Sequence, residues 1–110
     1  MTHSEQAALI WPVLVLAAKM HLVLTYGDLE GYTGIMALGQ GNALGLIHSY
    51  CEHRGHPHLN AIVVAADTGV PGTGYPSERT LAELLAEHMR VFGFDWSSAE
   101  KPRSQDFTTA

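Results

Sequence analysis

GQGNALGLIHSYCEHRGHPHLNAIVVAADTGVPGTGY, residues 39–75, contains the patterns that decide the fold. Its first part repeats apolar residues at the one-face spacing of an α-helix, and Gly55 suits the left-handed residue that ends such a helix. Pro57 prevents continuation, and the apolar run 61–66 predicts a short buried strand. The glycines and proline of 69–75 predict an irregular loop or wing. Helix, turn, strand and glycine-rich loop follow one another as in the second half of a winged-helix unit.

Two helices are predicted before this stretch. The first, at about residues 4–20, is apolar nearly all round and therefore belongs in the core. Pro12 either kinks this helix or divides it in two. Thr25 and Asp28 have the spacing of a capping box, which begins a second helix of about two turns. Its expected buried residues are Tyr26, Leu29 and Tyr32. Short helices joined by a glycine-bearing turn form the helix-turn-helix pattern.

A last, amphipathic helix begins after Ser77 or Thr80. Its apolar face is expected to contain Leu81, Leu84, Leu85, His88, Met89 and Phe92. Glu87 is expected on the opposite, polar face. The segment 97–110 has few apolar residues and is predicted to be a flexible tail. We therefore predict an α+β fold: a single winged-helix-like domain over residues 1–96, mostly helical with a short β element and a glycine-rich wing.

Composition limits the function classes. A chain of 110 residues forms one domain, and 6 Lys+Arg against 11 Asp+Glu give a formal charge of −5, which argues against general affinity for nucleic-acid phosphate or anionic membranes. The apolar run 7–18 is shorter than the roughly 20 residues of a membrane-spanning helix. A single cysteine forms no internal disulfide and fits a reducing compartment. We expect a cytoplasmic monomer or homodimer without a membrane partner.

Three motifs carry a resemblance to known proteins: TYGDL at 25–29, LGLIHSYC at 44–51 and DTGVPGTGY at 67–75. On these motifs the chain resembles a small family of bacterial and phage proteins. More distantly, it resembles the winged-helix DNA-binding domain of O6-alkylguanine alkyltransferases and alkyltransferase-like proteins, in which a TYG-type segment precedes the recognition helix. This resemblance implies DNA binding through a helix and a wing.

The chain departs from the alkyltransferases at their reactive cysteine. Their cysteine belongs to a Pro-Cys-His-Arg motif on the strand side of the recognition helix, where this chain has the cysteine-free run 61–66. The string 51–54, CEHR, is not equivalent, because it lies within the helix and lacks the proline. Cys51 falls on the predicted apolar face, so we expect it to be a core residue. No alkyl-transfer activity is therefore expected.

We expect a non-enzymatic module that presents the helix 40–54 and the wing 69–75 to a nucleic acid. The expected contact residues are Gln40, Asn42, His48, Ser49, His53, Arg54 and Thr73. Gln and Asn side chains read base edges, whereas Arg and His contact phosphate. Because only Arg54 is permanently positive in this region, DNA affinity should be weak and salt-sensitive.

A histidine-rich segment offers an alternative. His48, Cys51, His56 and His58 supply the imidazole and thiolate ligands that zinc favours. The spacing matches no standard zinc finger, so exposed surface histidines are the preferred interpretation and no cofactor is expected. No paired-carboxylate or Ser-His-Asp signature indicates an enzyme. Two hypotheses stay open beside nucleic-acid binding: a protein-interaction or inhibitor module of phage or mobile-element origin that acts on a host complex, and a small zinc-binding protein that uses residues 48–58.

Overall fold

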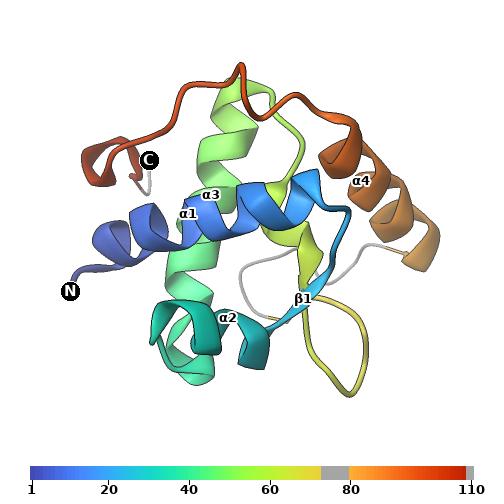
Figure 1. Cartoon of the computed structure of the whole chain (residues 1–110), viewed down its shortest axis with the longest axis horizontal. Coiled ribbons are helices and arrows are strands. Elements are labelled where there is room, and N and C mark those ends of the chain that lie inside the picture. Colours follow the sequence, from blue (N-terminus) through green and yellow to red (C-terminus); the bar gives the residue numbers. More distant parts are fainter. Residues whose placement is uncertain (73–79, 109–110) are drawn as a thin grey trace.

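A computed structural model of the chain describes residues 1–72 and 80–108. Its elements in chain order are α1 (His3–Lys19), β1 (Leu24–Thr25), α2 (Tyr26–Thr33), η1 (Ala37–Gly39), α3 (Gly41–Arg54), η2 (Leu59–Ile62), β2 (Val63–Val64), α4 (Leu81–Gly93) and η3 (Ser104–Asp106). Figure 1 shows α1 crossing α3, with α4 beyond the far end of α1 and both termini on one side. The fold is α+β and mostly helical, as predicted. No described helix is long and apolar enough to cross a membrane.

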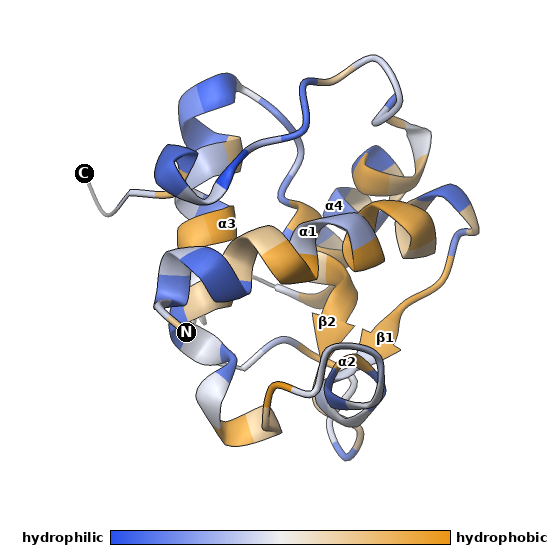
Figure 2. Cartoon of the chain, turned by 60° about the vertical axis from the view of Figure 1, so that its left-hand side comes forward, coloured by the Kyte–Doolittle hydropathy of each residue, from blue (hydrophilic) through white to orange (hydrophobic). Residues whose placement is uncertain are grey.

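Helix α1 forms the centre of the core. A capping box begins it, in which the Glu5 backbone N–H donates to the Thr2 hydroxyl at 3.1 Å and the Thr2 N–H donates to the Glu5 carboxylate at 2.8 Å. Pro12 lies inside one continuous helix, so it does not divide the segment in two. The buried residues of α1 are Ala7, Ile10, Trp11, Leu14, Ala17 and Ala18. Figure 2 shows this hydrophobic surface continuing into the two strands.

The sheet consists of two short parallel strands. Leu24 pairs with Val63 and Thr25 with Val64, so β1 and β2 join segments on either side of α2 and α3. The strand predicted over 61–66 is shorter in the structure, because Leu59–Ile62 forms the 3-10 helix η2 and only two residues of β1 are available for pairing. The apolar run predicted burial correctly for Ala61 to Val64, but Ala65 is half-buried and Ala66 is exposed, and the run did not predict strand length.

Helices α2 and α3 follow each other through a turn and η1. The Thr25 and Asp28 capping box begins α2 as predicted. Leu29 is fully buried, but Tyr26 is only half-buried and Tyr32 is 70% exposed, so the prediction that both tyrosines are buried was wrong. An eight-residue helix with one buried side chain leaves most of its surface to solvent. At the end of α3, Gly55 adopts the predicted left-handed conformation with φ 68°.

Helix α4 packs through a face that only partly matches the predicted one: Leu84 and His88 are buried as predicted, and Phe92 is half-buried. Its buried residues are Leu84, Glu87, His88 and Val91. Leu81, Leu85 and Met89 are exposed, against the prediction. Polar partners in and beside η2 explain the difference: the His88 Nε2 lies 2.7 Å from the Ala61 carbonyl oxygen, and Glu87 binds the His58 backbone N–H at 2.6 Å. These hydrogen bonds compensate for burying His88, as predicted, and Glu87, which the apolar pattern assigned to the polar face.

The segment after α4 returns to the core. Residues 97–108 were predicted to belong to a flexible tail, but Phe107 is 2% exposed and its carbonyl accepts a hydrogen bond from the Ser4 hydroxyl at 3.0 Å. Its ring lies 6.0 Å from that of Trp11, which also makes edge contacts with Tyr50 and Trp96. The domain therefore extends beyond residue 96, because one aromatic side chain anchors an otherwise polar segment.

Candidate functional site

Helix α3 places three of the predicted contact residues at the surface. Asn42 in its first turn and His53 and Arg54 in its last turn are exposed, and Ser49 between them is half-buried. Asn42 and His53 are separated by about 16 Å along the helix axis, because each residue adds 1.5 Å. The polar side chains thus mark both ends of the helix.

Arg54 is held by two neighbours. Its guanidinium lies 4.9 Å from the centroid of the Tyr50 ring, and its Nη1 lies 3.8 Å from the Glu100 carboxylate. Both charged side chains are largely exposed, so this ion pair contributes little to stability. Arg54 therefore remains able to exchange Glu100 for another anion.

Gln40 does not face solvent. It is fully buried, and its side-chain Nε2 donates to the Tyr26 carbonyl at 3.1 Å and to the Ile35 carbonyl at 3.0 Å. The prediction that Gln40 contacts nucleic acid is therefore corrected: its amide joins the start of α2, the turn and the start of α3. Thr73, the remaining predicted contact, lies outside the described residues.

The loop after β2 is joined to α2. The Gly72 N–H donates to the Tyr26 hydroxyl oxygen at 2.5 Å. A Cβ on residue 72 would lie 3.0 Å from that oxygen, so a larger residue there would require the Tyr26 ring to shift by a few tenths of an ångström. Gln40 and Tyr26 together connect α2, the start of α3 and this loop into one unit.

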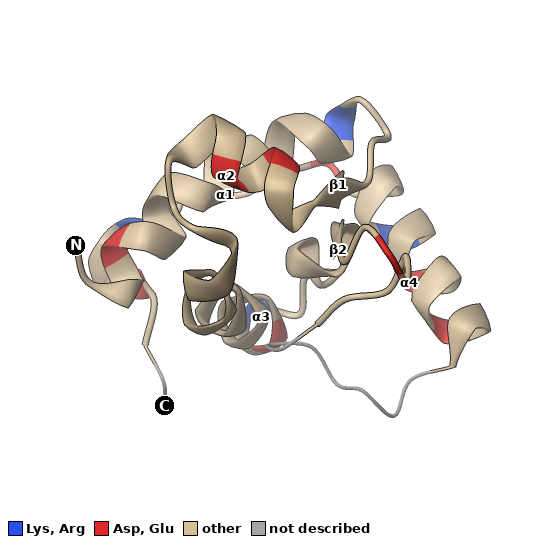
Figure 3. Ribbon diagram, turned by 90° about the horizontal axis from the view of Figure 1, so that it is seen from below, with Lys and Arg blue, Asp and Glu red and all other residues tan. Residues whose placement is uncertain are grey.

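Basic side chains do not gather into a patch in the described part of the chain. Arg90 contacts Glu87, and Arg103 lies 3.8 Å from Asp106, while Arg54 has Glu100 beside it. Figure 3 shows the Lys and Arg positions far apart on the ribbon, interspersed with Asp and Glu. Electrostatic attraction for a polyanion is therefore weak over residues 1–72 and 80–108.

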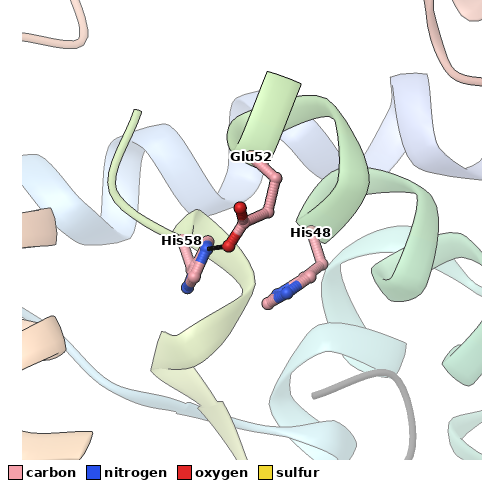
Figure 4. Close-up of side chains that lie close together, drawn as sticks. All are labelled: His48, Glu52 and His58. Atoms are coloured by element: carbon pink, nitrogen blue, oxygen red, sulfur yellow. Dashed lines mark hydrogen bonds and ion pairs between the residues drawn. The ribbon is translucent and has the colours of Figure 1, made fainter. Parts of the chain in front are cut away.

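A cluster of possible metal ligands lies where α3 meets the turn before η2. His48 and Glu52 are one helical turn apart on α3, and His58 approaches them from the turn (Figure 4). One nitrogen or oxygen atom from each residue lies within 4.8 Å of those of the other two. The His58 Nε2 lies 2.5 Å from the Glu52 carboxylate, and the His48 and His58 ring centroids are 4.1 Å apart.

Glu87 lies behind this cluster with its carboxylate buried. Its Oε2 accepts from the His58 backbone N–H and lies 3.7 Å from the His58 Nδ1, and its Oε1 accepts from the Arg90 Nε at 3.0 Å. Burial alone raises the pKa of the Glu87 carboxyl. The hydrogen bonds from the His58 backbone and the Arg90 side chain, with the positive charge nearby, outweigh burial and lower this pKa below its ordinary value.

Two residues of the predicted metal set lie elsewhere. Cys51 is fully buried on the apolar face of α3, and burial raises its pKa to about 12, as the core prediction implies. His56 packs against aromatic rings, with centroids 4.9 Å from Phe94 and 5.9 Å from Trp96. Burial, and then the Arg54 charge, lower the pKa of His56. Neither residue joins His48 and His58.

Comparisons of this chain with protein-family models, with curated proteins and with solved structures gave no match. The resemblance to alkyltransferase-like proteins therefore stays a prediction from the sequence motifs.

Two residues of the His48 site were not predicted from the sequence: Glu52 within the cluster and Glu87 behind it. Glu52 was overlooked because only histidine and cysteine were considered as ligands, although its position four residues after His48 places both on one helix face. Glu87 has no comparable sequence signal, since its partner His58 is distant in the chain. Its burial depends on how α4 is rotated against η2.

Proposed function

We propose that the chain is a non-enzymatic nucleic-acid-binding module of the winged-helix type. In this proposal α2 and α3 form the helix-turn-helix, α3 is the recognition helix and the loop after β2 is the wing. One observation carries it: buried Gln40 and the Tyr26 hydroxyl hydrogen-bond α2 to the start of α3 and to Gly72. A recognition helix and a wing must keep a fixed relative position to contact one duplex together.

The binding side chains in this proposal are those exposed on α3. Asn42 reads a base edge, and Arg54 exchanges Glu100 for a phosphate. With one or two cationic contacts, log K against log salt concentration has a slope between about −1 and −2. Binding is therefore weak, because the net charge of −5 opposes it.

Fluorescence anisotropy of labelled duplex and single-stranded DNA tests the proposal at low and near-physiological salt. Saturable binding is expected, with a shallow slope of log K against log salt concentration. Arg54→Ala should make this slope less negative by about one. Lys19→Ala, which removes the same charge from the end of α1, is the matched control and should leave binding nearly unchanged. Absence of binding at low salt, or equal losses in both variants, would contradict the proposal.

A second candidate, protein interaction, is favoured by an apolar hollow between α1 and α2. Val13, Ala17 and Leu24 line it, together with the exposed Leu16, Met20, Leu22 and Tyr32. Contiguous exposed apolar surface is typical of interaction sites. If the occupant is a second copy, sedimentation velocity should show concentration-dependent association that Leu16→Lys abolishes. Leu38→Lys, at an exposed leucine outside the hollow, should retain it.

A further inference from the structure

We propose that His48, Glu52 and His58 bind one divalent transition-metal ion of the zinc type, with a fourth coordination position open to solvent. The proposal does not depend on nucleic-acid binding. Two imidazoles and one carboxylate are a ligand set used by zinc sites that keep an open position. The Cys51 thiol and the His56 ring, which the sequence pattern included, are excluded by their burial and packing.

The geometry needs little rearrangement. Zinc bonds of 2.0–2.2 Å in a tetrahedron separate ligand atoms by about 3.3 Å. The three ligand atoms here lie within 4.8 Å of one another; the His58 Nε2 and the Glu52 carboxylate oxygen, 2.5 Å apart, would have to separate by about 1 Å or slightly less. The Glu52 side chain is 57% exposed, so rotation about its bonds can bring the carboxylate to the ion without disturbing the core. His48 and Glu52 are fixed on one face of α3 by their four-residue spacing.

Both histidines have an oxygen-bearing side chain near Nδ1. The His58 Nδ1 lies 3.7 Å from the buried Glu87 carboxylate, and the His48 Nδ1 lies 3.5 Å from the Asn60 amide nitrogen, Nδ2. The oxygen and nitrogen of an Asn amide are assigned from the surrounding hydrogen bonds, so Asn60 also fits as an acceptor. When Nδ1–H donates to such an oxygen, Nε2 is left as the metal ligand. Here the His58 Nε2 is paired with the Glu52 carboxylate; a metal at Nε2 would replace this contact and leave Nδ1–H facing Glu87.

Charge also favours a cation at this position. Glu52 and Glu87 place two carboxylates around the His58 ring, and Arg90 contacts only the Glu87 oxygen remote from it. The buried Glu87 is not a ligand in this proposal. Instead it orients His58 through Nδ1 and holds the turn through the His58 backbone N–H. The two carboxylates supply electrostatic attraction for a bound dication.

Metal titration of the full chain, produced without a histidine tag, tests the site. Zn²⁺ is titrated against a chromogenic chelator, and Co²⁺ is added separately because its visible absorption reports tetrahedral coordination. We expect one ion per chain, a rise in the unfolding temperature, and at least about tenfold weaker binding in Glu52→Gln and in His48→Gln.

His53→Gln is the matched control, since His53 is exposed on the same helix one residue after Glu52. It should bind zinc as the unchanged chain does. Glu52→Gln keeps the shape of an exposed side chain, so loss of binding in this variant reports ligation and not unfolding. Absence of stoichiometric zinc binding, binding unaffected by both ligand variants, or a loss in His53→Gln equal to theirs would overturn the proposal.

Discussion

Replacing Gln40 by Met tests the hydrogen bonds that join α2 to α3. Methionine has a similar length and fills the same buried space, but it donates no hydrogen bond. Two N–H···O=C bonds, to Tyr26 and Ile35, are lost. Each contributes about 1 kcal/mol net, and leaving the carbonyls without this donor adds to the loss. Among residues 1–72 and 80–108, the buried Gln40 Oε1 has no hydrogen-bond partner. Replacing this oxygen with an apolar group therefore raises the free energy of unfolding by about 1 kcal/mol and offsets part of the loss.

The free energy of unfolding should therefore fall by about 2 kcal/mol, which corresponds to a midpoint about 10 °C lower in a domain of this size. Urea and thermal unfolding followed by circular dichroism measure both values. Gln105→Met, at an exposed glutamine, is the control and should change stability by less than about 0.5 kcal/mol. Equal stability of the two variants would refute the role assigned to Gln40. Loss of DNA binding at unchanged stability would instead restore Gln40 as a contact residue.

Three further predictions concern the core, the thiol and the first helix. Phe107→Ala should lower the free energy of unfolding in urea by about 3 kcal/mol, because a fully packed aromatic ring is removed, whereas a freely moving tail would show no change. Cys51, with its pKa raised to about 12 by burial, should not react with a disulfide reagent at about pH 8 until the chain is unfolded; rapid labelling of the folded protein would contradict this. Hydrogen bonds from the Thr2 backbone N–H, and then from the Thr2 side chain, lower the pKa of the Glu5 carboxyl. The ionised Glu5 carboxylate therefore stabilises the folded chain fully above the ordinary pKa of 4.5, and this stabilisation is lost as the pH falls through the lowered pKa. The stability difference between the unchanged chain and Glu5→Gln should thus shrink on acidification, and a constant difference would argue against this cause.

Local signals predicted the helix starts well. Capping boxes at Thr25 and Thr80 begin α2 and α4, because each involves only residues three apart in the chain. Strand length was not predictable in the same way. The run after Pro57 is apolar enough for a strand, but Val63 and Val64 alone find partners in β1. Pairing depends on the other strand, which sequence periodicity does not describe.

Side-chain partners distant in sequence explain the other differences. Glu87 is buried because it meets the His58 backbone, and Gln40 is buried because two carbonyls need a donor. Polar residues of this kind are assigned to the surface by pattern, since burial is favourable only when a specific partner is present. The histidine-rich segment contains two residues of the proposed metal site, His48 and His58. In the proposed metal set Glu52 replaces Cys51 and His56, and this choice depends on which face of α3 is buried, which the sequence pattern alone does not describe.

A ¹⁵N-resolved NMR titration with a short DNA duplex at low salt tests the central claim, nucleic-acid binding by α3, most directly. If α3 binds nucleic acid, the backbone amides of Asn42, Ser49, His53 and Arg54 should shift progressively and saturably, with smaller changes along the apolar hollow of α1. Shifts confined to that hollow, around Leu16 and Met20, or no shift at any DNA concentration, would contradict this claim.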